Sequence, residues 1–337
     1  MFGSHRTAST PFLQACDAVV AEPLPDEAGS DDAVAAGERY VDEAVVLCRR
    51  LAVDVFVPGR HMLAVARRLE EFTALGTAVQ VSPAPAVATL AGKTDTYAHA
   101  AGLGVEVPLV RTVTDLDGYR RAVVELSERT GGAPLCFKPD RDFGGNGFRV
   151  LDERADQFAE ITEPPSVRIG PRTAERLLGS VDSFPPLVVS EYLEGDEVSV
   201  DCLSDADGRL LAALPRRKSG LPWTRELVDD PGARELARTM VEGTGLRYLS
   251  NVQIKHRLRN GRSEPVLLEV NTRAASGLYQ SCLAGGVNLP DLALRLTLGE
   301  PVTPPEPSYG PTVIVYNEAM PFLPTAPEPV AAVAPGV

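Results

Sequence analysis

The stretch at residues 265–279 reads PVLLEVNTRAASGLY, and it decides the fold that we expect. Its apolar run, residues 266–268, has β-branched character and follows the turn-forming pair Asn260-Gly261. A run of this kind after Asn-Gly is typical of a hairpin turn that leads into a buried strand. We therefore expect a β-hairpin whose second strand ends in polar residues.

Polar side chains follow this apolar run at every second position, as Glu269, Asn271 and Arg273. In a strand such residues point to one face, so a carboxylate, an amide oxygen and a guanidinium would lie in a row. Glutamate and asparagine oxygens suit Mg²⁺, which completes its shell with water and phosphates, and arginine suits a phosphate oxygen. The alternative is a strand-end ion pair between Glu269 and Arg273.

The composition of the chain argues against several classes of binding partner and of site. The chain has 337 residues, and its formal net charge of −13 argues against nucleic acid as the main partner. No apolar run approaches the length of a membrane span, so we expect no membrane partner. The five cysteines lack CxxC spacing and the four histidines lack an HExxH pattern, which argues against a zinc site and a disulfide framework. The odd cysteine count and the lack of a signal peptide favour the cytoplasm.

The first part of the chain alternates between strand-like and helix-like segments. We expect strands at 16–22, 53–58 and 78–82, and helices at 33–52, 62–75 and 87–102. Such alternation is typical of a parallel α/β arrangement. No glycine-rich phosphate fingerprint follows the first strand, so a complete dinucleotide-binding domain is not expected.

The remaining chain is richer in strands and contains two hairpins. One hairpin is predicted around residues 205–208 and the other around Asn260-Gly261. The other predicted elements are strands at 109–112, 135–137, 149–151, 187–190 and 313–316, helices at 117–130, 155–160, 174–178, 225–243 and 289–298, and a tail at 324–337.

A lysine and a glycine-rich loop follow the predicted strand at 135–137. Lys138 precedes Gly144, Gly145 and Gly147. Glycines let the backbone approach a phosphate closely, and their N–H groups can surround an anion, to which the lysine adds a charge. A glycine-rich hairpin turn without a ligand is the alternative.

The acidic segment EYLEGDE, residues 191–197, follows an apolar strand. A strand that ends in carboxylates and a glycine can form a linker that accepts a base and a ribose. The alternative is an acidic solvated turn.

A third charged segment is the run Arg216-Arg217-Lys218 at the end of a predicted strand. Guanidinium groups bind carboxylates and phosphates bidentately, which favours a clamp for an anionic substrate or a γ-phosphate. The alternative is a solvated loop end.

Five short motifs, in this order, resemble the ATP-grasp superfamily, and within it the carbamoyl-phosphate-synthetase-like branch of the carboxylate–amine ligases. They are Lys93, the strand with Lys138 and its glycine loop, EYLEGDE at 191–197, Asn251-Val252-Gln253, and Glu269-Val270-Asn271. The resemblance covers residues 80–300 and implies an α+β ATP-grasp fold, in which two subdomains grip ATP. We expect a shortened parallel α/β domain at 11–90, the ATP-grasp domain at 91–300 with subdomains at 115–193 and 194–300, and a Pro-rich extension at 301–337.

The resemblance also implies roles for individual residues. The ATP phosphates would contact Lys93 and Lys138, under a flap formed by Gly144, Gly145 and Gly147. The adenine would contact Glu191 and the backbone of Leu193, and the ribose would contact Glu197. Mg²⁺, with Mn²⁺ as a substitute, would bind Gln253, Glu269 and Asn271. The catalytic residues would be Arg273, Lys138 and Arg217, and the substrate would contact Arg216, Arg217, Lys218 and Arg273.

Two positions depart from the family pattern. Ser190 stands where an acidic residue is common, and Gln253 stands where many members have Asp or Glu. The metal site of this chain would therefore carry less negative charge.

The activity that the resemblance implies is ATP-dependent ligation of a small-molecule carboxylate to an amine through an acyl phosphate, and the resemblance also allows a homodimer. Three alternatives remain open. They are a small-molecule phosphotransferase, a carbamoyl-phosphate-type activation of bicarbonate, and a non-catalytic nucleotide-binding module.

Overall fold

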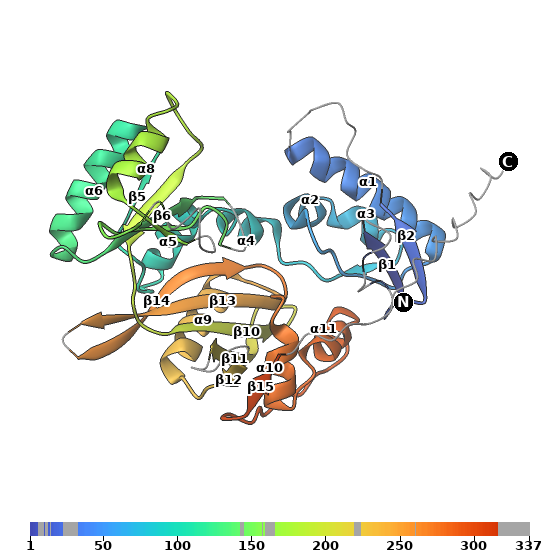
Figure 1. Cartoon of the computed structure of the whole chain (residues 1–337). Helices are drawn as coiled ribbons and strands as arrows, with labels where there is room; N and C mark the ends of the chain where they lie inside the picture. Colours follow the sequence, from blue (N-terminus) through green and yellow to red (C-terminus); the bar gives the residue numbers. More distant parts are fainter. Residues whose placement is uncertain are drawn as a thin grey trace. The chain divides into compact units, whose positions relative to one another are not determined.

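The computed structural model describes residues 1–5, 10, 13, 15–22, 33–141, 145–156, 158, 166–218, 224–259 and 261–315 (Figure 1). The chain divides into two compact units, Met1–Arg39 with Tyr316–Val337, and Tyr40–Val315. Most of the predicted helix at 155–160 and the whole predicted tail at 324–337 lie outside the described residues. In the smaller unit, strand β1 (Phe2–His5) pairs in parallel with β2 (Ala18–Ala21), which confirms the strand predicted at 16–22.

The first layer of the larger unit surrounds a small core between helices and a two-stranded sheet. Helix α1 (Ala33–Leu51), which belongs to this unit from Tyr40 onward, confirms the predicted helix at 33–52, and β3 (Val55–Phe56) pairs in parallel with β4 (Ala78–Val79). The stacked rings of Phe56 and Phe72 and the buried Val41 and Val65 fill this core.

The two helices that we predicted beside this layer are each interrupted. The segment 62–75 forms α2 (Met62–Arg67) and α3 (Leu69–Thr73), because Arg68 leaves the helical conformation and its guanidinium binds Asp42 and Glu71. The segment 87–102 forms α4 (Ala84–Thr89) and α5 (Lys93–Gly102). The break lies at Gly92, where a Cβ atom would lie 2.6 Å from the carboxylate of Asp140.

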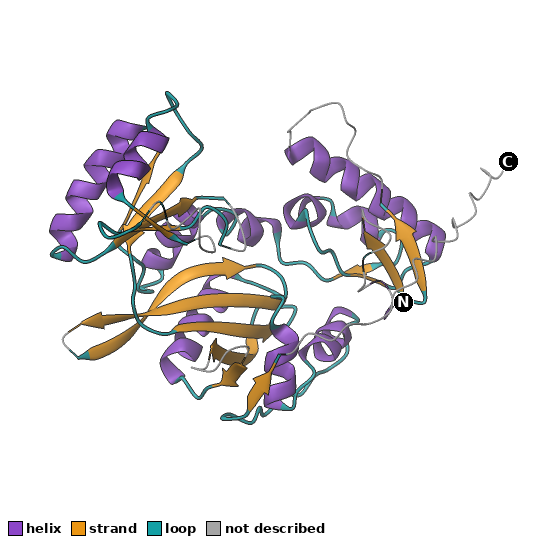
Figure 2. Ribbon diagram, viewed as in Figure 1, coloured by secondary structure: helices purple, strands orange, loops and turns teal. Residues whose placement is uncertain are grey.

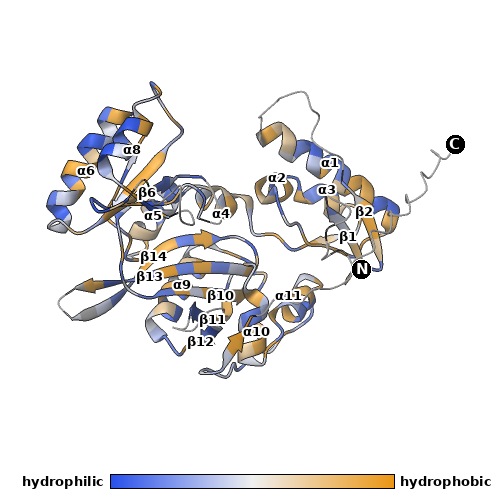
Figure 3. Ribbon diagram, in the orientation of Figure 1, coloured by the Kyte–Doolittle hydropathy of each residue, from blue (hydrophilic) through white to orange (hydrophobic). Residues whose placement is uncertain are grey.

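The next layer is a five-stranded sheet with helices α6 (Leu116–Thr130) and α8 (Pro171–Leu178) on one side (Figure 1). Its strand order is β5 (Val110–Val113), β9 (Leu187–Glu191), β6 (Leu135–Pro139), β7 (Arg149–Leu151) and β8 (Arg168–Ile169). Hydrophilic and hydrophobic residues lie side by side around α6 in Figure 3, as expected for a helix that covers a sheet. The predicted strands at 109–112, 135–137, 149–151 and 187–190 are thereby confirmed.

The largest layer is an antiparallel six-stranded sheet (Figure 2). Its order is β14 (Arg262–Asn271), β13 (Tyr248–Arg259), β10 (Glu197–Ser204), β11 (Leu210–Lys218), β12 (Thr224–Leu227) and β15 (Thr312–Ile314). Helix α9 (Pro231–Thr244) packs on one face, and α10 (Leu278–Gly285) and α11 (Leu289–Thr297) pack on the other. Both predicted hairpins are present, and β15 is the predicted edge strand.

Two details of this layer were not predicted. The segment 225–243 is mostly helical, as predicted, but α9 begins only at Pro231 after the cap Asp230, because residues 224–227 pair with β11 and β15. Helix α10 was not predicted, because its sequence LYQSCLAG mixes small and polar residues without a clear apolar period. Within the described residues, no helix is both long and apolar enough to span a bilayer.

Candidate active site

One face of the six-stranded sheet carries a row of polar residues across four strands. Ser199 of β10 lies opposite Arg216 of β11 and opposite Gln253 of β13, and Gln253 lies opposite Glu269 of β14. Directly opposed residues on neighbouring strands have close side chains on the same face. The row therefore places a guanidinium, a hydroxyl, an amide and a carboxylate side by side.

The three residues predicted to bind Mg²⁺ meet at the β14 end of this face. Gln253 is directly opposite Glu269, and Asn271 follows two residues further along β14 on the same face. None of these three side chains has a hydrogen-bond partner among the residues that the structure describes. The alternative ion pair is not formed either, since Arg273 is exposed and donates to the carbonyl of Ala274 at 2.9 Å.

Lys138 reaches this face from the other sheet. It lies at the end of β6, and its Nζ donates to the Tyr97 hydroxyl at 3.1 Å. Burial lowers the pKa of Lys138, and the carboxylates of Glu269 and Glu197 oppose that change. The lysine of the five-stranded sheet therefore lies in the field of the carboxylates of the six-stranded sheet.

A β-bulge explains how Lys138 is held there. The register of β13 and β14 shifts between Gln253 and Ile254, which leaves Leu268 as the extra residue of β14. The Leu268 carbonyl accepts a hydrogen bond of 2.8 Å from the Tyr97 hydroxyl, which in turn accepts from Lys138. The hydroxyl of Tyr97 thus links the bulge beside Glu269 to Lys138, the candidate phosphate-binding lysine.

Lys93 is the first residue of α5 and is buried. Its backbone N–H and its Nζ donate to the carbonyl of Asp140 at 3.2 and 3.3 Å, and the Asp140 carboxylate accepts from Thr94. These hydrogen bonds attach Lys93 to Asp140, two residues after Lys138.

The described part of the glycine loop has the backbone that glycine requires. Gly145 and Gly147 have φ of 75° and 66°, and a Cβ at Gly147 would lie 2.8 Å from the ring of Pro139. Gly144 lies outside the described residues. Phe148, directly after the loop, packs against Tyr192 with 6.4 Å between ring centroids, so the loop is joined to the segment that begins at Glu191.

Glu191 has a different environment from the one that we expected. Its carboxylate is buried, pairs with the guanidinium of Arg257 and accepts from the Leu109 N–H at 2.9 Å. Its side chain is thus directed at protein groups. The buried Leu193 has a backbone N–H without a partner among the described residues, so the backbone remains the candidate adenine contact. Glu197, the candidate ribose contact, is exposed at the start of β10 opposite Lys255.

The three cations at 216–218 do not share one face. Arg216 points to the face with the metal residues, since it lies opposite Ser199, and Lys218 has the same strand parity but is exposed. Arg217 points to the opposite face, where it binds Glu226 at 3.1 Å and Asp196 at 3.2 Å. The structure therefore brings Arg216, but not Arg217, together with Gln253 and Glu269.

Arg217 lines a cavity of about 610 Å³ on that opposite face. His256 and Asp230 also line it, with 3.4 Å between the imidazole Nε2 and the carboxylate, and Asp230 caps α9. This hydrogen bond raises the pKa of His256 and lowers the pKa of Asp230.

We expect this pair to make stability depend on pH. Because the folded-state pKa of His256 is raised, its stabilisation is complete below about pH 6.5 and is lost as pH rises through the folded-state value. Asp230→Asn, which keeps a capping side chain, should therefore destabilise the protein at pH 6 and much less at pH 9, as measured by urea unfolding. The control is Asp229→Asn, which removes a carboxylate paired with Arg234. Because Arg234 stays charged at both pH values, the free energy of unfolding should fall by the same amount at pH 6 and at pH 9.

Several residues of this site were not singled out from the sequence. Tyr97 has no motif, and Arg257 gives no local signal of its distant partner Glu191. Asp201 could have been found, because it lies four residues from the singled-out Glu197 on the same face of β10. Asn251 belongs to the motif Asn251-Val252-Gln253, but no contact was predicted for it.

The chain is similar in sequence and in fold to several known proteins. The chain is 25% identical over 187 residues to the arginine-specific large chain of carbamoyl phosphate synthase from Bacillus subtilis; this match covers 50% of the chain but 16% of that protein. A biotin carboxylase structure from Campylobacter jejuni has a TM-score of 0.61 at 15% identity, covering 89% of this chain and 65% of that one. A D-alanine–D-alanine ligase from Bacillus anthracis, complexed with ATP, has a TM-score of 0.53 at 18% identity, covering 83% and 86%.

These similarities define the class by its fold: the chain has the α+β fold of the ATP-grasp superfamily. More narrowly, residues 183–319 match the family described as "ATP-grasp in the biosynthetic pathway with Ter operon". The predicted domain limits at 11–90, 91–300 and 301–337 stay predictions.

Proposed function

We propose that this chain is an ATP-dependent, ADP-forming ligase that joins a small-molecule carboxylate to an amine. The observation that carries the proposal is that Lys138, from the five-stranded sheet, donates to Tyr97, which bonds to the Leu268 carbonyl beside the unpartnered row of Gln253, Glu269 and Asn271 on the six-stranded sheet. A cation that faces free oxygen ligands suits a nucleotide whose phosphates lie between the two sheets. The match to carbamoyl phosphate synthase supports the same class of chemistry.

The reaction would proceed in two displacements. A carboxylate oxygen attacks the γ-phosphorus of ATP, the bond from phosphorus to the bridging oxygen breaks, and ADP leaves. The amine nitrogen then attacks the acyl carbon, inorganic phosphate leaves, and the nitrogen loses a proton. Lys138 would hold the phosphates, Arg273 would stabilise the transferring phosphoryl group, and the glycine loop would keep water from the acyl phosphate.

The residues present fit a Mg²⁺ site of low charge. Gln253, Glu269 and Asn271 offer three hard oxygen donors without protein partners, as Mg²⁺ prefers. Among the described residues no group of three His, Cys, Asp or Glu side chains could hold a metal ion alone, so nucleotide phosphates would supply the remaining ligands. When bound, Mg²⁺ neutralises negative charge that builds on the phosphoryl oxygens.

A screen of ADP release with pairs of amino acids, and with bicarbonate, tests this function. We expect ADP and phosphate to form only when both a carboxylate and an amine are present. ADP release without phosphate would instead indicate a phosphotransferase, and release with bicarbonate alone a carbamoyl-phosphate-type activation. No calorimetric signal for Mg-ATP at saturating concentration would overturn the proposal. The homodimer and the cytoplasmic location stay predictions from the sequence.

Lys138→Ala should weaken Mg-ATP binding roughly ten- to a hundredfold, because one charge-assisted hydrogen bond contributes about 1.5–3 kcal/mol. The apparent affinity for the carboxylate should change less, since Lys138 faces the candidate phosphate position. Calorimetry with Mg-ATP measures the effect. Arg111→Ala, which removes an exposed cation of the same sheet, serves as the control and should leave the affinity unchanged. Equal Mg-ATP affinities in the Lys138 variant and the wild type would contradict the assignment.

A further inference from the structure

We propose that Asp201 is a positioning residue of this site, which holds the guanidinium of Arg216, through Ser281 and directly, as the group that receives the anionic end of the substrate. The inference rests on the proposed function and adds to it a residue that touches no substrate itself. It also selects Arg216 from the three cations at 216–218 as the anion-binding group.

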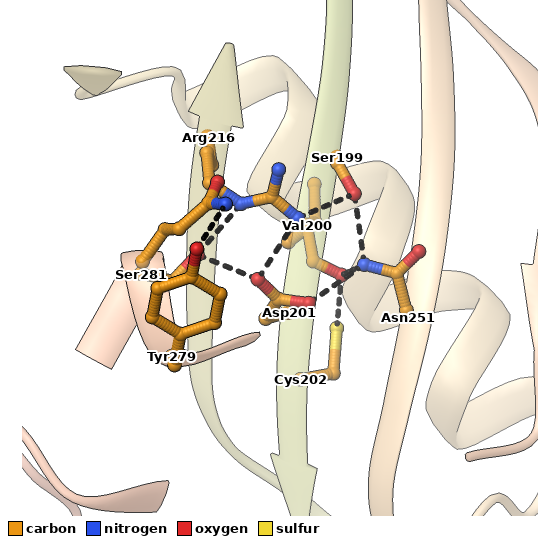
Figure 4. A network of polar contacts seen from close by, with 9 residues as sticks. Ser199, Val200, Asp201, Cys202, Arg216, Asn251, Tyr279 and Ser281 are labelled. Carbon is orange, nitrogen blue, oxygen red and sulfur yellow. Dashed lines mark hydrogen bonds and ion pairs between the residues drawn. The ribbon is translucent and has the colours of Figure 1, made fainter. Parts of the chain in front are cut away.

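The contacts of Asp201 link three elements of the site face (Figure 4). Asp201 lies in β10 and is completely buried. Its Oδ2 accepts from the Ser281 hydroxyl of α10 at 2.5 Å and lies 3.5 Å from Nη2 of Arg216 on β11. Its Oδ1 accepts from Nδ2 of Asn251 on β13 at 2.8 Å.

The guanidinium of Arg216 is held on several sides. Its Nε donates to Ser281 at 3.1 Å, and its Nη2 donates to Ser199 at 3.3 Å. A side chain at Gly277 would collide with the guanidinium, so the glycine lets the backbone lie flat against it. Only Nη1 has no hydrogen-bond partner among the described residues, which leaves one N–H edge for a ligand.

The position of Arg216 relative to the metal residues suits an acyl phosphate. Arg216, Ser199, Gln253 and Glu269 occupy neighbouring strands, so three strand spacings, about 14 Å, separate the backbones at the two ends of the row. The long arginine side chain covers part of this distance. A phosphoryl oxygen or carboxylate between the two ends would be reached by the guanidinium from one side and by the metal residues from the other.

A purely structural role for the network is the competing explanation. Burying a carboxylate is costly unless it is paired, and the network could serve only to dock α10 on the sheet. Burial indeed raises the pKa of Asp201, and Arg216 opposes the rise. The two explanations differ in one respect: a positioning role acts on ligand binding through Arg216, whereas a docking role does not need Arg216.

Calorimetry with inorganic phosphate as the probe, titrated into the protein saturated with Mg-ADP, tests this difference. Arg216→Ala, Asp201→Asn and Ser281→Ala should each weaken phosphate binding tenfold or more while the Mg-ADP affinity changes less than twofold. The control Ser204→Ala removes an equally buried hydroxyl from β10, which bonds to the Leu246 carbonyl, and should leave both affinities unchanged.

A double-mutant cycle completes the test. Ser281→Ala added to Arg216→Ala should cause no further loss of phosphate affinity, because Ser281 acts through Arg216. Additive losses, an unchanged phosphate affinity in Ser281→Ala or Asp201→Asn, or no phosphate binding to the wild-type Mg-ADP complex would overturn the positioning role. If Asp201→Asn fails to fold, the Ser281 arm decides alone. Failure of Mg-ADP itself to bind would instead overturn the proposed function, so the two failures are distinguishable.

Discussion

Glu269→Gln should lower kcat by about 10²–10³, which corresponds to a loss of about 2.7–4 kcal/mol of transition-state stabilisation. Glu269 is the only carboxylate among the three candidate metal residues, because Gln253 stands where the family often has an acid. The substitution would leave three neutral amides, and no carboxylate, to hold the ion. Steady-state ADP release with the best substrate pair from the screen measures the effect.

The protein should remain folded in this variant, since Glu269 has no hydrogen-bond partner among the described residues that the substitution would orphan. Titration of Mn²⁺ into the ADP complex, followed by electron paramagnetic resonance, should show weaker binding independently of turnover. Glu264→Gln, an exposed position on the same strand, is the control and should match the wild type in both measurements. Wild-type kcat and Mn²⁺ affinity in Glu269→Gln would show that the metal assignment is wrong.

The sequence was sufficient to predict the hairpin and the face of the metal strand. Alternation in β14 places Glu269 and Asn271 together, and the pairing with β13 adds Gln253. The bulge at Leu268 was not predictable, because one extra residue depends on tertiary contacts, here the hydrogen bond from Tyr97, rather than on any local pattern.

Strand parity explains the mixed result at residues 216–218. Neighbouring residues in a strand must face opposite sides, so the sequence could predict that one of Arg216 and Arg217 points inward, but not which one. Register decides it, since Arg216 lies opposite Ser199. The breaks at Arg68 and Gly92 have a similar origin, because the partners Asp42 and Asp140 are distant in sequence.

The side-chain contacts of Glu191 differ from those that the resemblance implies. Glu191, the first residue of EYLEGDE, is the last residue of β9, and its carboxylate pairs with Arg257. Both side chains are buried, with 7% and 8% exposed, and the guanidinium also contacts the largely exposed Glu106 at 3.1 Å and the Val107 carbonyl at 3.1 Å. This ion pair joins β9 of one sheet to β13 of the other.

Glu191→Gln should therefore lower the free energy of unfolding by about 3–5 kcal/mol, because it leaves the buried guanidinium without its main counter-charge. Urea denaturation measures the loss. Glu125→Gln is the matched control: it breaks an exposed pair with Arg111 and should cost about 1 kcal/mol or less. The double variant Glu191→Leu with Arg257→Met replaces the pair by apolar groups and should recover most of the stability. If Glu191→Gln instead kept wild-type stability and weakened Mg-ATP binding, the carboxylate would be an adenine contact, as the resemblance alone implied, and the ion pair would not be the reason for its burial.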